Sequence, residues 1–412
     1  MPTLIVFCHL RWDFVFQRPQ HLMTRLAEHY QILFVEEPVH SEGPAHLQKT
    51  AVAPNITVCR PHTPILHTHG FHDDQLPTLQ GLLADLVPEG ERPVVWFYTP
   101  MALPLLQGLN PTLVVYDCMD ELAAFKNPPK QLLQRESALL NIADLVFTGG
   151  PSLYEAKKDR HANAHCFSSS VDAKHFRQAL DAAISHPDQA HIAGPRLGFY
   201  GVIDERFDTD LVRQMAAAHP EWQIVLVGPV VKIDPAELPR ADNVHYMGQR
   251  NYDELPKFLA GWDLCLLPFA MNDSTKFISP TKVLEYMAAE LPSVSTPITD
   301  VKVPYGDVVA IAETPDEFIE ACERMLNATP EQKASLAERM RAIVARTSWD
   351  NTANAMHQLI QTTEPANRAQ RMKAHLADIA EASADNVSPL PVKQAAPAVE
   401  VDAQPIKAQA AE

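Results

Sequence analysis

The chain has 412 residues, of which 46% are hydrophobic and 21% are charged, so it is long enough to bury two hydrophobic cores. Its 51 acidic residues outnumber its 34 lysines and arginines, and the formal net charge is -17. Because such a surface repels phosphate groups, the composition excludes a broad electrostatic grip on nucleic acid or anionic lipid.

The first half of the chain alternates short apolar runs with segments of helical spacing. The run at residues 3–8 has no basic residue before it and is too short for a signal peptide, so we expect a strand there. Strands that alternate with helices form βαβ units, which predicts a parallel sheet. The expected strands are residues 3–8, 31–35, 56–59, 94–98, 113–116 and 145–148, and the expected helices are residues 18–29 and 129–142.

A second series of the same kind begins near Pro195. The chain therefore predicts an α/β protein of two doubly wound domains in tandem, residues 1–185 and 195–345. The expected strands of the second series are residues 196–200, 223–227, 243–246, 264–268, 293–296 and 308–311, and the expected helices are residues 209–218, 252–260, 281–289 and 315–326.

The end of the chain differs in composition from the rest. We expect a closing helix within residues 346–362, whereas residues 365–412 are rich in Ala, Pro and Glu. Scattered prolines preclude one continuous helix, so we predict a partly helical and then disordered tail. Such a tail is a candidate segment for binding a protein partner.

The six cysteines are scattered, and no two form a Cys-x-x-Cys pair. Several lie in apolar runs, as Cys265 does, which is typical of buried, reduced thiols in a cytosolic protein. No stretch approaches the roughly 18–20 apolar residues of a membrane span. We therefore predict a cytoplasmic location and leave open a peripheral contact with the inner face of the membrane.

The most informative run begins at Ser279. Ser279 suits a helix N-cap, Pro280 suits the first helical turn, and Thr281 follows them. A helix N-terminus attracts anions, and Lys282 adds a positive charge. Glu285 could accept hydrogen bonds from both hydroxyls of a ribose. These five residues indicate a nucleoside-diphosphate site, and the alternative is an ordinary capped helix packed on the core.

The same run resembles the donor motif of the retaining GT-B-fold glycosyltransferases, the family 4-like group that includes sucrose and mannosyl transferases. That motif has two glutamates separated by seven residues, followed by a tail. Here Glu285 matches the second glutamate and residues 287–296 match the tail. Phe277 stands in place of the first glutamate, which in the family faces the transferred sugar, and Glu290 stands where the family usually has Gly.

Two further runs, residues 9–21 and 115–121, resemble a bacterial subgroup of teichuronic-acid and exopolysaccharide glycosyltransferases. The resemblance spans roughly residues 3–360. It implies a GT-B fold, in which two Rossmann-like domains enclose a cleft. It also implies a nucleotide-diphosphate sugar as co-substrate, no cofactor and no metal. The implied acceptor is a glycan, a lipid-linked molecule or a small molecule in cell-surface polysaccharide biosynthesis.

Loops at the carboxyl ends of parallel strands form ligand crevices, which makes the segment after the first strand a candidate site. Relatives carry a Gly-rich loop there, and this chain has none. Trp12, Arg18 and His21 are the candidate acceptor-side residues, since Arg18 and His21 could supply side-chain donors. The alternative is that the aromatic residues pack and Arg18 is exposed.

The candidate catalytic residues also follow strands. Asp117 and Asp120 could orient an acceptor hydroxyl or stabilise positive charge, and capping of a helix by Asp120 is the alternative. The resemblance assigns donor-phosphate contacts to Gly201 and Arg206. Together with Lys282, Arg206 would stabilise the charge that develops on the departing diphosphate. The alternative for Arg206 is an exposed side chain that balances neighbouring acids.

Two clusters could suggest a metal, and we predict none. The pair Asp208 and Asp210 lies at an expected helix start, where capping explains it. The histidine-rich stretch matches no zinc spacing and reads as a loop. That stretch contains His62, His67, His69 and His72, followed by Asp73 and Asp74.

Two other functions remain open. Phe277 at the first glutamate position favours a degenerate nucleotide-sugar-binding or scaffold protein. A sugar-nucleotide 2-epimerase shares the two-domain frame, although the N-terminal signature fits it less well. The chain lacks Gly-x-Gly-x-x-Gly, P-loop, Gly-x-Ser-x-Gly and His-Glu-x-x-His motifs, which argues against common dinucleotide oxidoreductases, P-loop enzymes, serine hydrolases and zincins.

Overall fold

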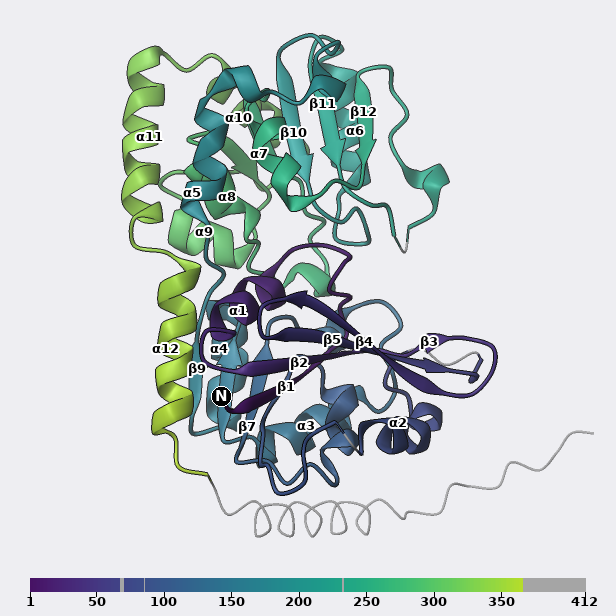
Figure 1. Cartoon of the computed structure of the whole chain (residues 1–412). Coiled ribbons are helices and arrows are strands. Elements are labelled where there is room, and N and C mark those ends of the chain that lie inside the picture. Colours follow the sequence, from purple (N-terminus) through teal and green to yellow (C-terminus); the bar gives the residue numbers. More distant parts are fainter. Residues whose placement is uncertain (67–69, 85, 232, 366–412) are drawn as a thin grey trace, which may run out of the picture. The chain divides into compact units, whose positions relative to one another are not determined.

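The structure is a computed structural model that describes residues 1–412 except 67–69, 85, 232 and 366–412 (Figure 1). The chain divides into two units, Met1–Arg368 and Ala369–Glu412. The predicted tail, residues 365–412, lies almost wholly outside the described residues, so its state stays a prediction. All that follows concerns the first unit.

The first sheet has nine strands in the order β3-β5-β2-β1-β6-β7-β8-β9, with β4 paired to β5. Its strand pairs are parallel except β4–β5, which is antiparallel. The strands are β1 (Thr3–Cys8), β2 (Gln31–Glu36), β3 (Val39–His40), β4 (His46–Ala53), β5 (Ile56–Thr63), β6 (Val94–Phe97), β7 (Leu113–Cys118), β8 (Leu145–Thr148) and β9 (Ala164–Cys166). The expected parallel sheet is therefore present, whereas β3, β4 and β9 were not predicted.

Helices pack on both faces of this sheet and form two cores. Its helices are α1 (Arg18–Leu26), α2 (Leu76–Leu83), α3 (Leu132–Ile142) and α4 (Pro151–Lys157). Helix α1 ends at Leu26, not at residue 29, and α3 begins at Leu132, not at residue 129.

The second sheet has six parallel strands in the order β12-β11-β10-β13-β14-β15. The strands are β10 (Arg196–Tyr200), β11 (Gln223–Val227), β12 (Val244–Gly248), β13 (Leu264–Leu267), β14 (Ser293–Ser295) and β15 (Ala310–Ile311). The helices that accompany it are α5 (Ala173–Phe176), α6 (Thr209–Ala218), α7 (Leu255–Leu259), α8 (Lys282–Ala288), α9 (Thr299–Tyr305), α10 (Pro315–Leu326) and α11 (Pro330–Val344).

The last described helix, α12 (Trp349–Thr362), returns to the first sheet and lies beside α1 (Figure 1). Its Trp349, Ala353, Met356 and Ile360 side chains are buried in the core that contains β1 and α1. Conversely, Phe176 is buried in the core of the second sheet. The chain thus crosses between the two cores more than once, and the boundaries at residues 185 and 195 stay a prediction.

The order of the strands shows where a ligand should bind. In the first sheet β1 lies between β2 and β6, and in the second β10 lies between β11 and β13. Each is a switch point, where successive connections leave in opposite directions and open a crevice at the carboxyl end of the strand. The loops that follow Cys8 and Tyr200 therefore flank the expected site.

Candidate active site

Loops that follow the strand ends of both sheets line one pocket. Its lining from the first sheet comes after β1, β7, β8 and β9, and its lining from the second comes after β10, β11, β12 and β13 and from the start of α8. The lining includes Val15, Phe16, Gln17, Arg18, Met119, Asp120, Gly149, Ser169, Tyr200, Gly201, Arg206, Gly228, Gln249, Arg250, Phe269, Ser279, Pro280, Thr281, Lys282 and Glu285. All seven predicted donor-binding residues are in this set.

Helix α8 begins later than predicted. It runs from Lys282 to Ala288, and the N-cap position belongs to Thr281, which makes no side-chain cap hydrogen bond. The expected N-cap at Ser279 was wrong. A residue before proline disfavours the helical region, and the carbonyl of Ser279 accepts a hydrogen bond from Ser169 Oγ at 2.9 Å. Ser279 is therefore tied to the loop after the first sheet and still lines the pocket.

Lys282 places a cation in the pocket. Its Nζ lies 5.2 Å from the centre of the Phe199 ring and 5.3 Å from that of Phe269. Desolvation and the nearby Arg206 lower the pKa of Lys282 to about 8, although Glu285 and Asp204 act in the opposite direction. Within the described residues this ammonium forms no ion pair. It is therefore available to an anionic ligand.

Two glycines make room for this cation. Gly201 has φ +140°, and a Cβ there would lie 3.0 Å from Nζ of Lys282. Gly228 has φ +146°, and a Cβ there would lie 1.9 Å from the carbonyl oxygen of Gly201. Both positions have a backbone conformation that side chains rarely adopt. The pocket wall therefore consists of bare backbone beside Lys282.

Glu285 lies one turn into α8 and is 7% exposed. The Tyr200 hydroxyl donates a hydrogen bond to Glu285 Oε2 at 2.5 Å. Burial raises the pKa of Glu285 to about 7, although Tyr200 and Lys282 act to lower it. Near neutral pH this side chain is therefore balanced between its charged and neutral forms.

Arg206 and Asp120 face the pocket from opposite sheets. Arg206 donates to Asp204 from Nε at 3.0 Å and from Nη2 at 2.7 Å, and its guanidinium lies over Phe125. Arg206 thus balances the charge of Asp204, as the alternative interpretation expected. It also lines the pocket. Burial raises the pKa of Asp120 to about 6, and Arg206 and Arg18 partly offset this effect.

Arg18 and Asp117 form an ion pair at the edge of the pocket. The Arg18 guanidinium donates to Asp117 at 3.0 Å and 2.9 Å and to the Phe167 carbonyl at 2.7 Å. Asp117 is fully buried and is absent from the pocket lining among the described residues. The structure therefore places Asp117 as a support for Arg18, and its catalytic role stays a prediction.

The other two acceptor-side candidates also lie outside the pocket lining as described. Trp12 packs edge-on against Phe34, with ring centres 5.1 Å apart. His21 is 2% exposed and stacks on Trp349, with ring centres 4.7 Å apart. Desolvation by burial lowers the pKa of His21 to about 3, so its ring is neutral. The His21 ring also contacts the ring of Phe16, which lines the pocket, with ring centres 4.7 Å apart.

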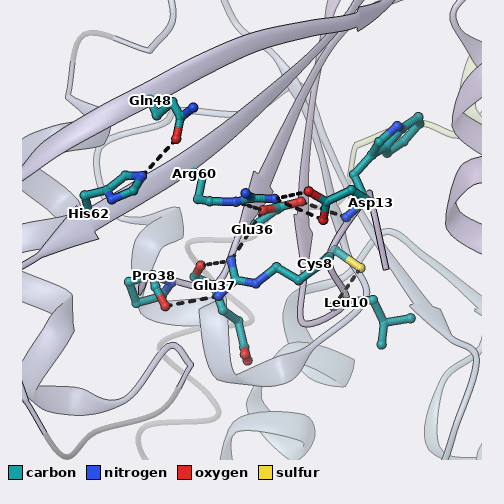
Figure 2. A network of polar contacts seen from close by, with 11 residues as sticks. Cys8, Leu10, Asp13, Glu36, Glu37, Pro38, Gln48, Arg60 and His62 are labelled. Atoms are coloured by element: carbon teal, nitrogen blue, oxygen red, sulfur yellow. Dashed lines mark hydrogen bonds and ion pairs between the residues drawn. The ribbon is translucent and has the colours of Figure 1, made fainter. Parts of the chain in front are cut away.

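The loop after β1 is held by charged residues instead of glycines (Figure 2). Arg60 donates to Glu36 at 2.6 Å and to Asp13 at 3.1 Å. Glu36 also accepts a hydrogen bond from the Trp12 backbone N–H at 2.7 Å, and Arg11 contacts Glu36 and the Pro38 carbonyl. These contacts fix the loop to β2 and β5.

The two departures from the family motif have distinct structural outcomes. Phe277 packs against the core of the first sheet, and within the described residues it does not line the pocket. Glu290 has φ +56°, a left-handed conformation that favours glycine, and it pairs with Arg341 at 2.6 Å. The usual Gly at this position is thus explained by the backbone.

Sequence reasoning missed Tyr200, Gln249, Arg250 and Ser169 as pocket residues. Tyr200 ends β10 directly before Gly201, so its position at a strand end was the available signal. Gln249 and Arg250 similarly follow β12. Ser169 follows no predicted element, and no sequence signal identified it.

No group of three or more potential metal ligands occurs among the described residues. His62 contacts Gln48 at 2.9 Å, and His72 caps a short 3₁₀ helix, whereas His67 and His69 lie outside the described part. Asp208 accepts a hydrogen bond from the Leu211 N–H and caps α6. Among the same residues, no helix is both long and apolar enough to cross a bilayer.

Comparison with solved structures shows the fold of the protein. The fold matches sucrose-phosphate synthase from Thermosynechococcus elongatus with a TM-score of 0.71 and 17% identity, covering 88% of this chain and 98% of that one. It matches the Anabaena protein HepE, solved in complex with UDP and glucose, with a TM-score of 0.60 and 14% identity, covering 88% and 100%. The predicted GT-B fold of two Rossmann-like domains is confirmed.

Comparison with known sequences identifies the class of enzyme. Residues 194–328 match the family model described as glycosyl transferases group 1. Over 311 residues the chain is 25% identical to TuaH of Bacillus subtilis (strain 168), named as a teichuronic acid biosynthesis glycosyltransferase, with 69% of this chain and 76% of that protein covered. The chain is a glycosyltransferase, and its similarity to the group 1 family lies in residues 194–328.

Proposed function

We propose that the protein transfers a sugar from a nucleotide-diphosphate sugar to a glycan, lipid-linked or small-molecule acceptor in cell-surface polysaccharide biosynthesis. The observation that carries the proposal is the placement of Lys282, Glu285 and Gly201 on one pocket wall, opposite Asp120 and Arg18. The names of TuaH and of the HepE complex, which contains UDP and glucose, support the same reading.

The second domain would hold the donor. Lys282 supplies the positive charge for the diphosphate, and Gly201 allows the diphosphate to approach the backbone closely. Ser279 and Thr281 add polar groups at the start of α8. Glu285 would accept hydrogen bonds from the ribose hydroxyls. Among the described residues Lys282 forms no ion pair with a carboxylate, and an ammonium of this kind beside a glycine wall suits a diphosphate.

The first domain would hold the acceptor. In the transfer, the bond between the anomeric carbon and the diphosphate oxygen breaks, and a bond to an acceptor hydroxyl oxygen forms. Lys282 and Arg206 stabilise the charge that stays on the diphosphate. Asp120, with its pKa raised to about 6, would take the proton of the hydroxyl near neutral pH. We propose retention of the anomeric configuration and no metal requirement.

The proposed partners are the nucleotide sugar and its acceptor, without nucleic acid. We propose a cytoplasmic enzyme, and peripheral contact with the inner face of the membrane belongs to the proposal where the acceptor is lipid-linked. The tail after residue 365 remains the candidate segment for a protein partner.

The test is a panel of nucleotide sugars, studied by calorimetry and by turnover with and without acceptors. Binding with transfer or slow hydrolysis supports the proposal. Tight binding without turnover would favour a scaffold, for which Phe277 at the first glutamate position is the specific observation. Interconversion of the sugar without an acceptor would identify an epimerase instead.

A further inference from the structure

We infer that Tyr200 is a positioning residue, whose hydroxyl holds one oxygen of Glu285 so that the carboxylate presents itself to the vicinal diol of the donor's ribose. The inference rests on the proposed donor site and names a residue that the sequence reasoning did not assign. Tyr200 would act through Glu285, without contacting the reacting atoms.

The geometry of the pair is specific. Tyr200 ends β10 and Glu285 lies in the first turn of α8, and both side chains line the pocket. The distance of 2.5 Å between the hydroxyl and Oε2 is typical of a hydrogen bond to an ionised carboxylate. Within the described part of the chain, the other oxygen, Oε1, accepts no hydrogen bond and is left for a ligand.

The ring of Tyr200 is itself held on several sides. Its backbone N–H donates to the Tyr286 hydroxyl at 3.4 Å, and the two rings meet edge-on with centres 5.2 Å apart. Phe176 stacks parallel to it at 6.4 Å and Trp262 lies 6.0 Å away. Because the ring cannot turn freely in this packing, the hydroxyl has one direction, toward Glu285.

Protonation links this hydrogen bond to pH. The groups that act on Glu285 are Tyr200 from β10 and Lys282 from α8. Burial and, to a lesser degree, Glu285 raise the pKa of Tyr286 from α8 and of Tyr252 from the segment before α7. Burial raises the pKa of Glu285 to about 7, and the Tyr200 hydroxyl lowers it. Burial also raises the pKa of Tyr200 well above 10, so this hydroxyl remains a donor.

The sign of the effect follows from these directions. Ionised Glu285 is a stronger acceptor for the ribose hydroxyls than its protonated form, so this contact should raise affinity as the pH rises through the pKa of Glu285. Removing the Tyr200 hydroxyl removes an effect that lowers this pKa. The rise in affinity should then move to higher pH, and the affinity at neutral pH should fall.

The experiment is calorimetric titration of Tyr200→Phe with UDP and GDP and with their 2′-deoxy forms, between about pH 6 and pH 8. We expect the variant to bind the better ribonucleotide about 3- to 10-fold more weakly near pH 7, the loss expected for one hydrogen bond. The loss should be smaller for the deoxy ligand, and the pH profile should move upward.

Two controls separate positioning from packing. Tyr252→Phe removes a buried hydroxyl that has no hydrogen-bond partner in the described part of the chain, and it should change affinity less than about twofold. In the background of Glu285→Gln, which cannot ionise, Tyr200→Phe should add little further loss.

The outcomes distinguish this inference from the proposed function. If the wild-type chain binds neither ribonucleotide, the donor site itself is wrong, and the role of Tyr200 is overturned with it. Two other results would overturn only the positioning role, provided that the wild type binds. In the first, Tyr200→Phe leaves both the affinity and the pH profile unchanged. In the second, the substitution weakens binding of the ribonucleotide and of the deoxy ligand equally.

Discussion

Burial decides the charge of His21, and this has a consequence for stability. The folded-state pKa is lowered to about 3, from an ordinary value of 6.5. At pH values below 6.5 the unfolded chain therefore binds a proton that the folded chain does not. Stability contributed by this residue is present at neutral pH and is lost as the pH falls toward 3.

We predict that His21→Phe, which keeps a ring against Trp349, makes stability less sensitive to acid. Between about pH 6 and pH 5 the wild type should lose about 1 kcal/mol more than the variant, because one site costs about 1.4 kcal/mol per pH unit. Urea unfolding at several pH values measures the difference. The exposed His40, changed to Phe, is the control and should behave as the wild type does. Parallel curves for His21→Phe and wild type would contradict the prediction.

Residue types alone indicated the donor-binding residues around the start of α8. They could not show which charged side chains form ion pairs with each other. Ser279, Lys282 and Glu285 are close in sequence, so one motif identified them together. Arg18 and Asp117 are 99 residues apart, and nothing in either segment shows that they pair. An arginine and an aspartate at strand ends suit a substrate site or a buried ion pair equally well, and only the packing distinguishes them.

At the scale of elements, α11 and α12 connect the two cores. Met340 and Val344 of α11 are buried with the second sheet, whereas Trp349 of α12 is buried with the first. Ser348 caps α12 through the N–H of Asn351, so the second helix begins directly after the link. The last helix is thus part of the first core.

We predict that Trp349→Ala destabilises the first core by about 3–5 kcal/mol, the usual cost of removing a buried aromatic side chain. Asn354→Ala on the exposed face of the same helix should cost less than about 0.5 kcal/mol. Urea unfolding followed by intrinsic fluorescence and circular dichroism provides the measurement. Equal stability of the two variants would show that α12 does not contribute to the core.

Element types were easier to predict than element limits. Strands β10, β11 and β13 are largely buried apolar runs, so their sequence identifies them. Strand β4 is largely exposed and contains Gln48 and Lys49, so it has no apolar signal and forms because β5 offers a partner. The start of α8 depends on the contact between Ser169 and Ser279, which lies outside the reach of local patterns.

At the scale of the molecule, the alternation of strands and helices predicted two parallel sheets, because few folds accommodate that order. The return of α12 was not expected, since helical spacing shows that a face is apolar but not which core it joins. The position of the cleft could be anticipated from the switch points of the two sheets. Which residues meet across the cleft depends on tertiary packing.

We predict that deleting residues 366–412 leaves the melting transition nearly unchanged. Their composition lacks the aromatic residues that contribute most to a core, so the segment should add little to folding stability. Calorimetric melting of the full chain and of residues 1–365 compares them directly. A fall of several degrees in the midpoint would show that the segment docks on the first unit.

We propose that Lys282 holds the diphosphate of a sugar donor during transfer. The most direct test is the rate at which nucleoside diphosphate is released from a panel of nucleotide sugars. We expect the wild type to release it from at least one donor and Lys282→Ala to be slower by about tenfold or more, because the developing charge loses its cation. Lys276→Ala, an exposed lysine in the preceding loop, should match the wild type. Release by Lys282→Ala at the wild-type rate, or no release by the wild type from any donor, would contradict the account.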